Sequence, residues 1–350
     1  MTPAPSVRNL SRGGVHHATG RKYPGNICRN CGLGGHLIGA CRFPAISLGV
    51  ICFRANVSTG ELEYLMVQRR HSYNFVEFTL GKYGSAAGGE AYLTKMVAMM
   101  TARERALITA GDFAVMWRDA WDNPHGSRVN DTYNSSLSKY VDVLPRLREI
   151  IAKTPTFLEE PEWTFPKGRR KIIRVPPGAL SLSASAPGPR RVSESNRTGA
   201  CREFVEETGV QNSNLVLVDV PAFQEDFLGK PSGVRFRNIF FLGYLNTNDS
   251  RTSLPINRAN PAQAREIRQV RWFTYRETMA HICEHNVERR ALFDRIDAFL
   301  REAPPHKIYR GSHHLVASHV SVVGTGGMDM DSQTHLSRES SDSSTARQST

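Results

Sequence analysis

The sequence predicts an α+β fold in which two β-rich parts are separated by a helical segment and preceded by a small metal-binding module. Runs of residues typical of strands occupy residues 45–68 and recur between residues 163 and 273. From Gly89 to Lys153, apolar residues instead recur at three- and four-residue steps, which is the helical period. Three cysteines and a histidine lie within residues 28–41, a pattern that favours metal ligation over a disulfide framework.

The composition describes a basic chain with room for one catalytic core and additions. Its 350 residues include 45 Lys and Arg against 33 Asp and Glu, a formal charge of +12. Such a field favours polyanionic partners such as RNA, although a generically basic protein without a nucleic-acid role is the alternative. No segment approaches the roughly 18 apolar residues of a membrane span, and the N-terminus lacks a signal-peptide core. We therefore expect a soluble, cytoplasmic protein without a membrane partner.

The expected elements follow one another along the chain. A hairpin is predicted from strands at Ala45–Phe53 and Leu62–Gln68 with a turn at Asn56–Gly60. Helices are predicted at Ala91–Met100, Arg103–Thr109, Phe113–Trp121 and Leu137–Ile151. Later strands are predicted at Trp163–Phe165, Leu215–Val220, Phe223–Phe227, Val234–Leu245 and Ile267–Phe273. A charged helix at Asn196–Thr208 lies among these strands, and a helix at Val287–Arg301 closes the core.

The carboxylates of the helix at 196–208 are the strongest functional signal. Glu203, Glu206 and Glu207 fall at positions i, i+3 and i+4, so their side chains share one face. Like charges on one helix face destabilise the helix by roughly 0.2–0.5 kcal/mol per pair. A divalent cation reverses this, because carboxylate oxygens are ligands for Mg²⁺ and Mn²⁺. The sequence therefore predicts a metal site here, with a charged surface helix as the alternative.

Two neighbours of these glutamates support the prediction. Arg202 precedes Glu206 by four residues and can hold its carboxylate, and Gly209 can form the left-handed cap that ends the helix. A cation at this face would neutralise phosphate charge, polarise phosphorus and lower the pKa of an attacking water.

The run Gly188-x5-Glu194-x7-Arg202, continued by the residues EFVEETGV, resembles the box of the Nudix hydrolases at each fixed position. The resemblance implies an α/β/α sandwich around a mixed sheet. It also implies that Glu203, Glu206 and Glu207 are catalytic metal ligands, with Glu194 as a supporting ligand.

The segment Trp163–Arg169, with the sequence WTFPKGR, resembles the lead-in of decapping Nudix enzymes. In those enzymes the glycine after Pro-Lys is the first glycine of the box. Here residues 169–187, including the Ala- and Ser-rich stretch 179–186, separate Gly168 from Gly188, and either glycine could take that part. We expect the intervening segment to be a mobile, basic-edged loop near the active site.

The run Val67–Tyr83 resembles a stretch of poxvirus and giant-virus decapping enzymes that precedes a helical insertion. Arg69 and Arg70 would bind phosphates through bidentate guanidinium groups, or else mark a solvated strand end. The other expected phosphate or RNA contacts are Lys167, Arg169 and Arg170.

Glu266 looks like the place where these relatives carry a catalytic glutamate outside the box. An exposed glutamate without a role is the alternative, and Glu225 is the reserve candidate. Candidates to stack on the methylguanine of a cap are Tyr73, Phe75, Tyr83, Phe223 and Trp163.

The Cys/His cluster has the spacing C-x2-C-x4-H-x4-C. Its members, Cys28, Cys31, His36 and Cys41, would hold Zn²⁺ in a closed tetrahedral site. Such knuckles also precede the Nudix domain in some giant-virus relatives. The knuckle could be a structural cap on the core or an RNA clamp, with Arg29 and Arg42 able to touch phosphates in either case.

The resemblance implies a metal-dependent pyrophosphohydrolase acting on capped mRNA, in the host cytoplasm if the chain is viral. It would release 7-methylguanosine diphosphate and 5′-monophosphate RNA. The alternatives are hydrolysis of free diphosphoinositol polyphosphates or dinucleoside polyphosphates, and a non-catalytic RNA-binding adaptor. The expected division is a disordered basic arm (1–25), the zinc knuckle (26–43), the Nudix domain (44–84 and 160–285), a helical insertion (85–159), a C-terminal helix (286–310) and a disordered Ser/Thr-rich tail (311–350).

Overall fold

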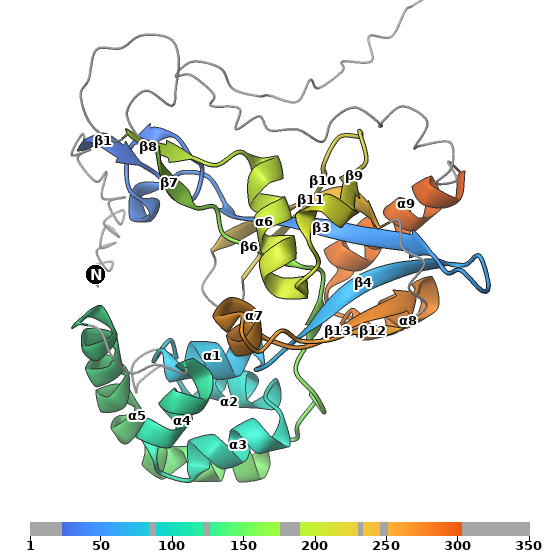
Figure 1. Ribbon diagram of the computed structural model, residues 1–350. Coiled ribbons are helices and arrows are strands. Elements are labelled where there is room, and N and C mark those ends of the chain that lie inside the picture. Colours follow the sequence, from blue (N-terminus) through green and yellow to red (C-terminus); the bar gives the residue numbers. More distant parts are fainter. Residues whose placement is uncertain are drawn as a thin grey trace, which may run out of the picture.

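The computed structural model describes residues 23–83, 89–121, 127–175, 190–229, 234–245 and 251–302. The predicted tail at 311–350, nearly all of the basic arm, the stretch 179–186 and Gly188 lie outside the described residues. Figure 1 shows two groups of elements in the described part, a β-sheet with its covering helices and a cluster of helices below it.

Nine of the described strands form one mixed sheet. Its central order is β10 (Phe223–Leu228), β11 (Arg235–Leu245), β3 (Ala45–Ala55), β4 (Leu62–Arg69), β13 (Ile267–Thr274) and β12 (Ser253–Leu254). Strands β11 and β3 are parallel, and the remaining pairs are antiparallel. The short strand β9 (Leu215–Leu217), which follows the 3-10 turn η2 (Asn212–Asn214), pairs with β11.

The hairpin of β3 and β4 opens in its middle and admits the Pro-Lys-Gly segment. The two strands pair with each other only near the turn, from Phe53 with Tyr64 to Ala55 with Leu62. Beyond that point β5 (Trp163–Thr164) pairs with β4, and β6 (Lys167–Gly168) pairs with β3. A Cβ atom on Gly49 would lie 2.4 Å from the carbonyl oxygen of Pro166, so this close crossing requires glycine.

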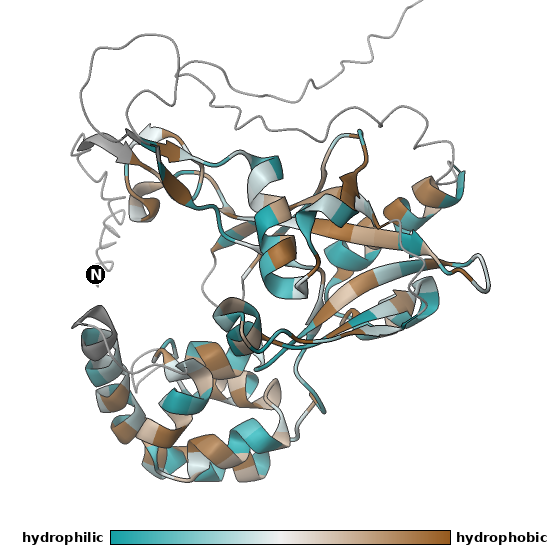
Figure 2. Ribbon diagram, in the orientation of Figure 1, coloured by the Kyte–Doolittle hydropathy of each residue, from teal (hydrophilic) through white to brown (hydrophobic). Residues whose placement is uncertain are grey.

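Both faces of the sheet are buried. In β3, Leu48, Val50 and Cys52 face α6 (Asn196–Thr208), whereas Ile51 and Phe53 face the opposite side. Helices α8 (Tyr275–His281) and α9 (Val287–Glu302) cover that opposite side. Figure 2 shows the largely hydrophobic β3 next to the mixed surface of α6. The arrangement confirms the predicted sandwich of helices around a mixed sheet.

A second apolar core belongs to the helices between β4 and β5. They are α1 (Tyr73–Thr79), α2 (Glu90–Ala98), α3 (Ala102–Thr109), α4 (Phe113–Trp121) and α5 (Ser127–Lys153). The long helix α5 begins ten residues before the expected Leu137. Helix α1 lies before residue 85 yet packs into the same core, because Phe75 and Phe78 are buried in it.

The segment expected to be a loop between Gly168 and Gly188 contains a strand in its described part, where that prediction is wrong. This strand, β7 (Ile172–Val175), pairs antiparallel with β8 (Arg190–Ser193), which follows Gly188 in the sequence. The N-terminal knuckle has its own short strands, β1 (Tyr23–Ile27) and β2 (Gly34–Gly35), and the turn η1 (Ile38–Ala40). Helix α7 (Pro261–Glu266) lies between α6 and the helical cluster (Figure 1).

Among the described helices, none combines the length and apolar character needed to cross a lipid bilayer.

Candidate active site

Helix α6 presents the predicted carboxylates to the Pro-Lys-Gly segment. Ser195 caps the helix by accepting the Thr198 N–H at 3.1 Å, and Gly209 ends it with φ of 74°. Phe204 is fully buried against the sheet and fixes the rotation of the helix. The backbone N–H of Lys167 donates to Glu207 Oε2 at 2.9 Å, so the carboxylate face does not point into open solvent.

Gly168 lies directly beneath Glu203. A Cβ atom at this position would be 2.3 Å from the carboxyl carbon of Glu203, so a side chain there would displace the Glu203 carboxylate. Gly168 therefore occupies the place beside the carboxylates, whereas Gly188 lies outside the described residues.

Arg202 gathers three carboxylates around one guanidinium group. Its Nη1 donates to Glu203 Oε1 at 2.7 Å and to Glu206 Oε2 at 3.1 Å. Its Nε and Nη2 donate to the two oxygens of Glu194 at 3.0 and 2.6 Å. Burial alone would lower the pKa of Arg202, but Glu194 and Glu203 outweigh it and raise the pKa. Arg202 therefore holds Glu206, as predicted, and it holds Glu203 as well.

The carboxylate of Glu194 binds Arg202 and does not join the carboxylate face of Glu203, Glu206 and Glu207. Its side chain is buried, and Oε1 also accepts the backbone N–H of Lys171 at 2.6 Å. Glu194 is buried and both of its oxygens accept from protein donors, so in this structure it positions Arg202. Its expected part as a supporting metal ligand stays a prediction.

Negative charge is crowded at this face. Burial raises the pKa of Glu207 to about 8, against the lowering effect of Lys167, and Glu203 and Glu266 raise it further. Burial likewise raises the pKa of Glu203, although Arg202 opposes it. Lys171 Nζ reaches Glu206 Oε1 at 2.6 Å but is itself half exposed. A set of clustered carboxylate oxygens with incomplete neutralisation fits a hard divalent cation such as Mg²⁺ or Mn²⁺.

A cationic and aromatic group borders Glu207. The guanidinium carbon of Arg69 lies 3.9 Å from the centre of the Tyr73 ring, and Lys167 Nζ donates to the Tyr73 hydroxyl at 3.0 Å. Partial desolvation by the surrounding protein raises the pKa of the Tyr73 hydroxyl, but Lys167 and Arg69 outweigh it and lower the pKa to about 8. Arg69 and Lys167 are thus the predicted cations that the structure brings to the carboxylates.

The other predicted cations point elsewhere. The side chain of Arg70 reaches the carbonyl of Ala264 in α7 at 3.4 Å. Arg169 is exposed and donates to the carbonyl of Ile46 at 2.9 Å. Arg170 is only 8% exposed and donates to the carbonyl oxygen of Glu194 at 2.5 Å. The prediction that Arg170 binds phosphate or RNA is therefore wrong, because its donors are buried and already engaged.

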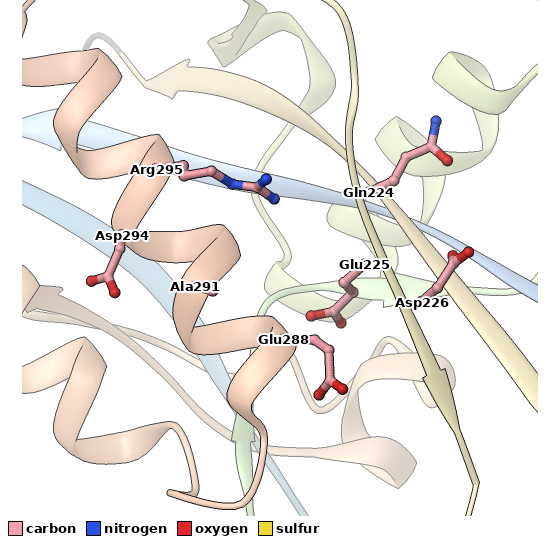
Figure 3. Close-up of a pocket in the computed structure, with 7 residues that line it drawn as sticks. All are labelled: Gln224, Glu225, Asp226, Glu288, Ala291, Asp294 and Arg295. Carbon is pink, nitrogen blue, oxygen red and sulfur yellow. The ribbon is translucent and has the colours of Figure 1, made fainter.

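The two glutamates expected outside the box differ in setting. Glu266 ends α7, its side chain is 51% exposed, and it raises the pKa of Glu207. Glu225 is buried in an ion pair with Arg289 and accepts the Asn238 amide at 2.5 Å. Figure 3 shows that Glu225 points toward α9, where a pocket of about 440 Å³ lies between β10 and α9. That pocket is on the α9 side of the sheet, away from α6.

Burial separates the aromatic candidates. Phe75 and Tyr83 are at most 1% exposed in the helical core, so the prediction that they stack on a base is wrong. Trp163 packs edge-on against Phe273, with ring centres 4.9 Å apart. Tyr73 is the exposed member of the set, at 42%.

Glu162, which lies beside the site, was not predicted from the sequence. Glu162 accepts the backbone N–H of Tyr73 at 3.2 Å, and its own carbonyl accepts from Arg69 N at 3.0 Å. Burial raises the pKa of Glu162 to about 6, against the effect of Arg69. Its position directly before Trp163 was the available signal, but a lone glutamate in a connecting segment carries no pattern.

The predicted knuckle residues come together. The ligand atoms of Cys28, Cys31, His36 and Cys41 all lie within 4.8 Å of one another, and this group could hold a metal ion. Gly32 and Gly35 have φ of 80° and 88°, which lets the chain turn between the ligands. Three thiols and an imidazole match the donor set that Zn²⁺ prefers.

No protein-family model matches the chain. A protein of Acanthamoeba polyphaga mimivirus named for mRNA decapping is 27% identical over 270 residues, covering 70% of this chain and 67% of that protein. The mRNA-decapping protein g5R of African swine fever virus is 26% identical over 231 residues, covering 65% of this chain and 83% of that protein. These relatives confirm the predicted resemblance to viral mRNA-decapping proteins.

Among solved structures, two of an Ap4A hydrolase from C. elegans are similar to the chain. The binary complex covers 73% of this chain and 98% of that chain, at 14% identity and a TM-score of 0.34. The second structure covers 73% and 97%, at 13% identity and a TM-score of 0.31.

The part assigned to Glu194 leads to a prediction for metal binding. Glu194→Gln removes one charge from the pair with Arg202 and should weaken Mn²⁺ binding by about 10- to 100-fold, as losses of residues that orient metal ligands do. Titration followed by electron paramagnetic resonance of free Mn²⁺ measures this. The control is Glu159→Gln at an exposed position. Equal Mn²⁺ affinity in the two variants would show that Glu194 does not support the site.

Proposed function

We propose that this relative of the viral mRNA-decapping proteins is a metal-dependent pyrophosphohydrolase that removes the 5′ cap from mRNA. Its products would be 7-methylguanosine diphosphate and 5′-monophosphate RNA. The observation that carries the proposal is the carboxylate face of α6, which lies against the Pro-Lys-Gly segment and beside Arg69. The decapping name of the relatives supports the choice of substrate.

The carboxylates of Glu203, Glu206 and Glu207 would hold Mg²⁺ or Mn²⁺. Such a cation, when bound, neutralises the charge of the diphosphate and lowers the pKa of an attacking water. Arg202 keeps Glu203 and Glu206 in place by its hydrogen bonds of 2.7 and 3.1 Å, so the ligand set is oriented before substrate arrives.

Arg69 and Lys167 would bind the phosphate oxygens of the cap. The Arg69 guanidinium lies over the Tyr73 ring, and Lys167 contacts both the Tyr73 hydroxyl and the Glu207 carboxylate. This arrangement supports phosphate binding by Arg69 beside the carboxylates. A guanidinium can bind two phosphate oxygens at once, whereas the Lys167 ammonium acts as a point charge. The exposed Arg169 is available for the RNA that follows the cap, in keeping with a net charge of +12.

Glu266 would accept the proton of the attacking water. It is half exposed and close enough to Glu207 to raise the pKa of that residue. Glu225 does not suit this role, since Arg289 neutralises it on the α9 side of the sheet. As water attacks phosphorus, its proton passes to Glu266 and the bond to the leaving phosphate breaks.

Tyr73 is the aromatic residue proposed to meet the methylguanine base. Its ring is exposed beside Arg69 and Lys167, so a base stacked there would keep its phosphates near both cations. We place this activity in the cytoplasm, that of the host if the chain is viral.

The first test uses RNA labelled in its cap. Wild type with Mn²⁺ should release labelled 7-methylguanosine diphosphate, and Glu206→Gln should reduce kcat by at least about 100-fold because a metal ligand is lost. Glu159→Gln, at an exposed site, controls for general damage. Binding of RNA without release of nucleotide by wild type would indicate an adaptor. Cleavage of free dinucleoside polyphosphates alone would indicate a small-molecule hydrolase.

The second test separates two adjacent arginines. Arg69→Lys loses the bidentate guanidinium at the carboxylates and should lower kcat/KM for capped RNA about 10- to 100-fold. Arg70→Lys should have an effect at least about ten times smaller, since Arg70 reaches the carbonyl of Ala264 in α7. Steady-state kinetics on the same RNA measures both, and equal losses would contradict the assignment of phosphate binding to Arg69.

A further inference from the structure

Asn30 joins the knuckle to the core of the protein. It is 3% exposed and lies between the ligands Cys28 and Cys31 in the sequence. Its backbone N–H and its side-chain amide approach the sulfurs of Cys28 and Cys41 at 3.4 and 3.3 Å. The same amide donates to the carbonyl of Pro44 at 2.7 Å, and its oxygen accepts from Ile46 N at 2.7 Å. Asn30 therefore contacts two of the predicted metal ligands, one through its backbone and one through its side chain, and its side chain also contacts the start of β3.

Arg170 continues this connection toward α6. Its guanidinium is buried, and Nε lies 3.4 Å from the backbone oxygen of Asn30. Nη1 donates to the carbonyl oxygen of Glu194 at 2.5 Å, and Nη2 donates to the side chain of Asn196 at the start of α6. A buried guanidinium needs all of its acceptors, because an unpaired buried charge is costly. Displacement of Asn30 would therefore disturb Arg170.

The connection ends at the carboxylates. Glu194 holds Arg202, and Arg202 in turn holds Glu203 and Glu206. The knuckle also packs directly on β8, since a Cβ on Gly32 would lie 2.7 Å from Ser193 Oγ. The knuckle and the carboxylate helix are thus joined by buried polar contacts of defined geometry.

We propose that the knuckle is a metal-dependent buttress of the active site, with Asn30 and Arg170 as positioning residues. A loop as short as residues 28–41 depends on its metal for a fixed structure. Zinc in the knuckle fixes Asn30, Asn30 supports Arg170, and Arg170 holds the Glu194 backbone on which Arg202 depends. Zinc binding therefore strengthens the binding of a divalent cation at α6. The inference rests on the proposed metal site at Glu203, Glu206 and Glu207.

Because binding free energies are reciprocal, the two metals must affect each other equally. If zinc raises Mn²⁺ affinity by a given factor, saturating Mn²⁺ raises zinc affinity by the same factor. An RNA clamp that merely sits beside the core requires no such relation. The knuckle also exposes the apolar side chains of Leu33, Leu37 and Ile38, which are not members of this chain of contacts.

The test measures Mn²⁺ affinity of the full chain by electron paramagnetic resonance, with and without zinc. Zinc removal should raise the Mn²⁺ dissociation constant at least about fivefold. Glu206→Gln, measured in parallel, gives the Mn²⁺ bound outside α6. Zinc-loaded Arg170→Lys should show the same loss as zinc removal, and stripping zinc from that variant should add little. The control is Arg29→Ala, at an exposed knuckle position next to Asn30.

The outcomes separate the two proposals. Unchanged Mn²⁺ affinity on zinc removal, with affinity intact in Arg170→Lys, would overturn the buttress and leave the proposed function standing. An equal loss in Arg29→Ala would also overturn it, since the effect would not run through Arg170. Absence of Mn²⁺ binding to the zinc-loaded wild type would overturn both proposals. Circular dichroism of zinc-loaded Arg170→Lys verifies that its fold is intact, so its result stands even if the stripped protein unfolds.

Discussion

The crowding of like charges on one face of α6 is the constraint on which the site depends. Three carboxylates share that face, and two of them have pKa values raised chiefly by burial. Arg202 binds two of the three, Glu203 and Glu206, and also binds Glu194 beside the face. The backbone N–H of Lys167 donates to the third, Glu207, and that of Lys171 donates to Glu194. These contacts orient the carboxylates but do not neutralise all of their negative charge. A bound divalent cation can neutralise the remainder.

The sheet is arranged to serve this face. Strands β3 and β4 separate so that the Pro-Lys-Gly segment can enter between them, and two glycines permit the close approach. Gly49 lets the segment cross β3, and Gly168 leaves room for the carboxylate of Glu203. The same opening places Arg69 at the end of β4, beside Lys167 and Tyr73. The cations that would bind phosphate thus come from the same strands that support the metal ligands.

Local sequence signals predicted the bounds of the carboxylate helix, whereas tertiary contacts determine the surroundings of the individual arginines. Helix α6 has its predicted bounds because Ser195 and Gly209 cap it through residues close in sequence. The roles of Arg69 and Arg70 could not be separated from sequence, because adjacent side chains at a strand end face different surroundings. Arg170 is buried only because the knuckle lies over it, and that contact joins residues 140 positions apart.

The clustered carboxylates of α6 are expected to destabilise the protein unless a divalent cation binds them. Urea unfolding of wild type and of Glu207→Gln, each with and without Mn²⁺, tests it most directly. Without Mn²⁺ the variant should be at least as stable as wild type, since it removes a carboxylate that is buried and repelled by Glu203 and Glu266. With Mn²⁺ at 100 times its dissociation constant, wild type should gain about 2.7 kcal/mol and the variant much less. A wild type that Mn²⁺ does not stabilise would contradict the account.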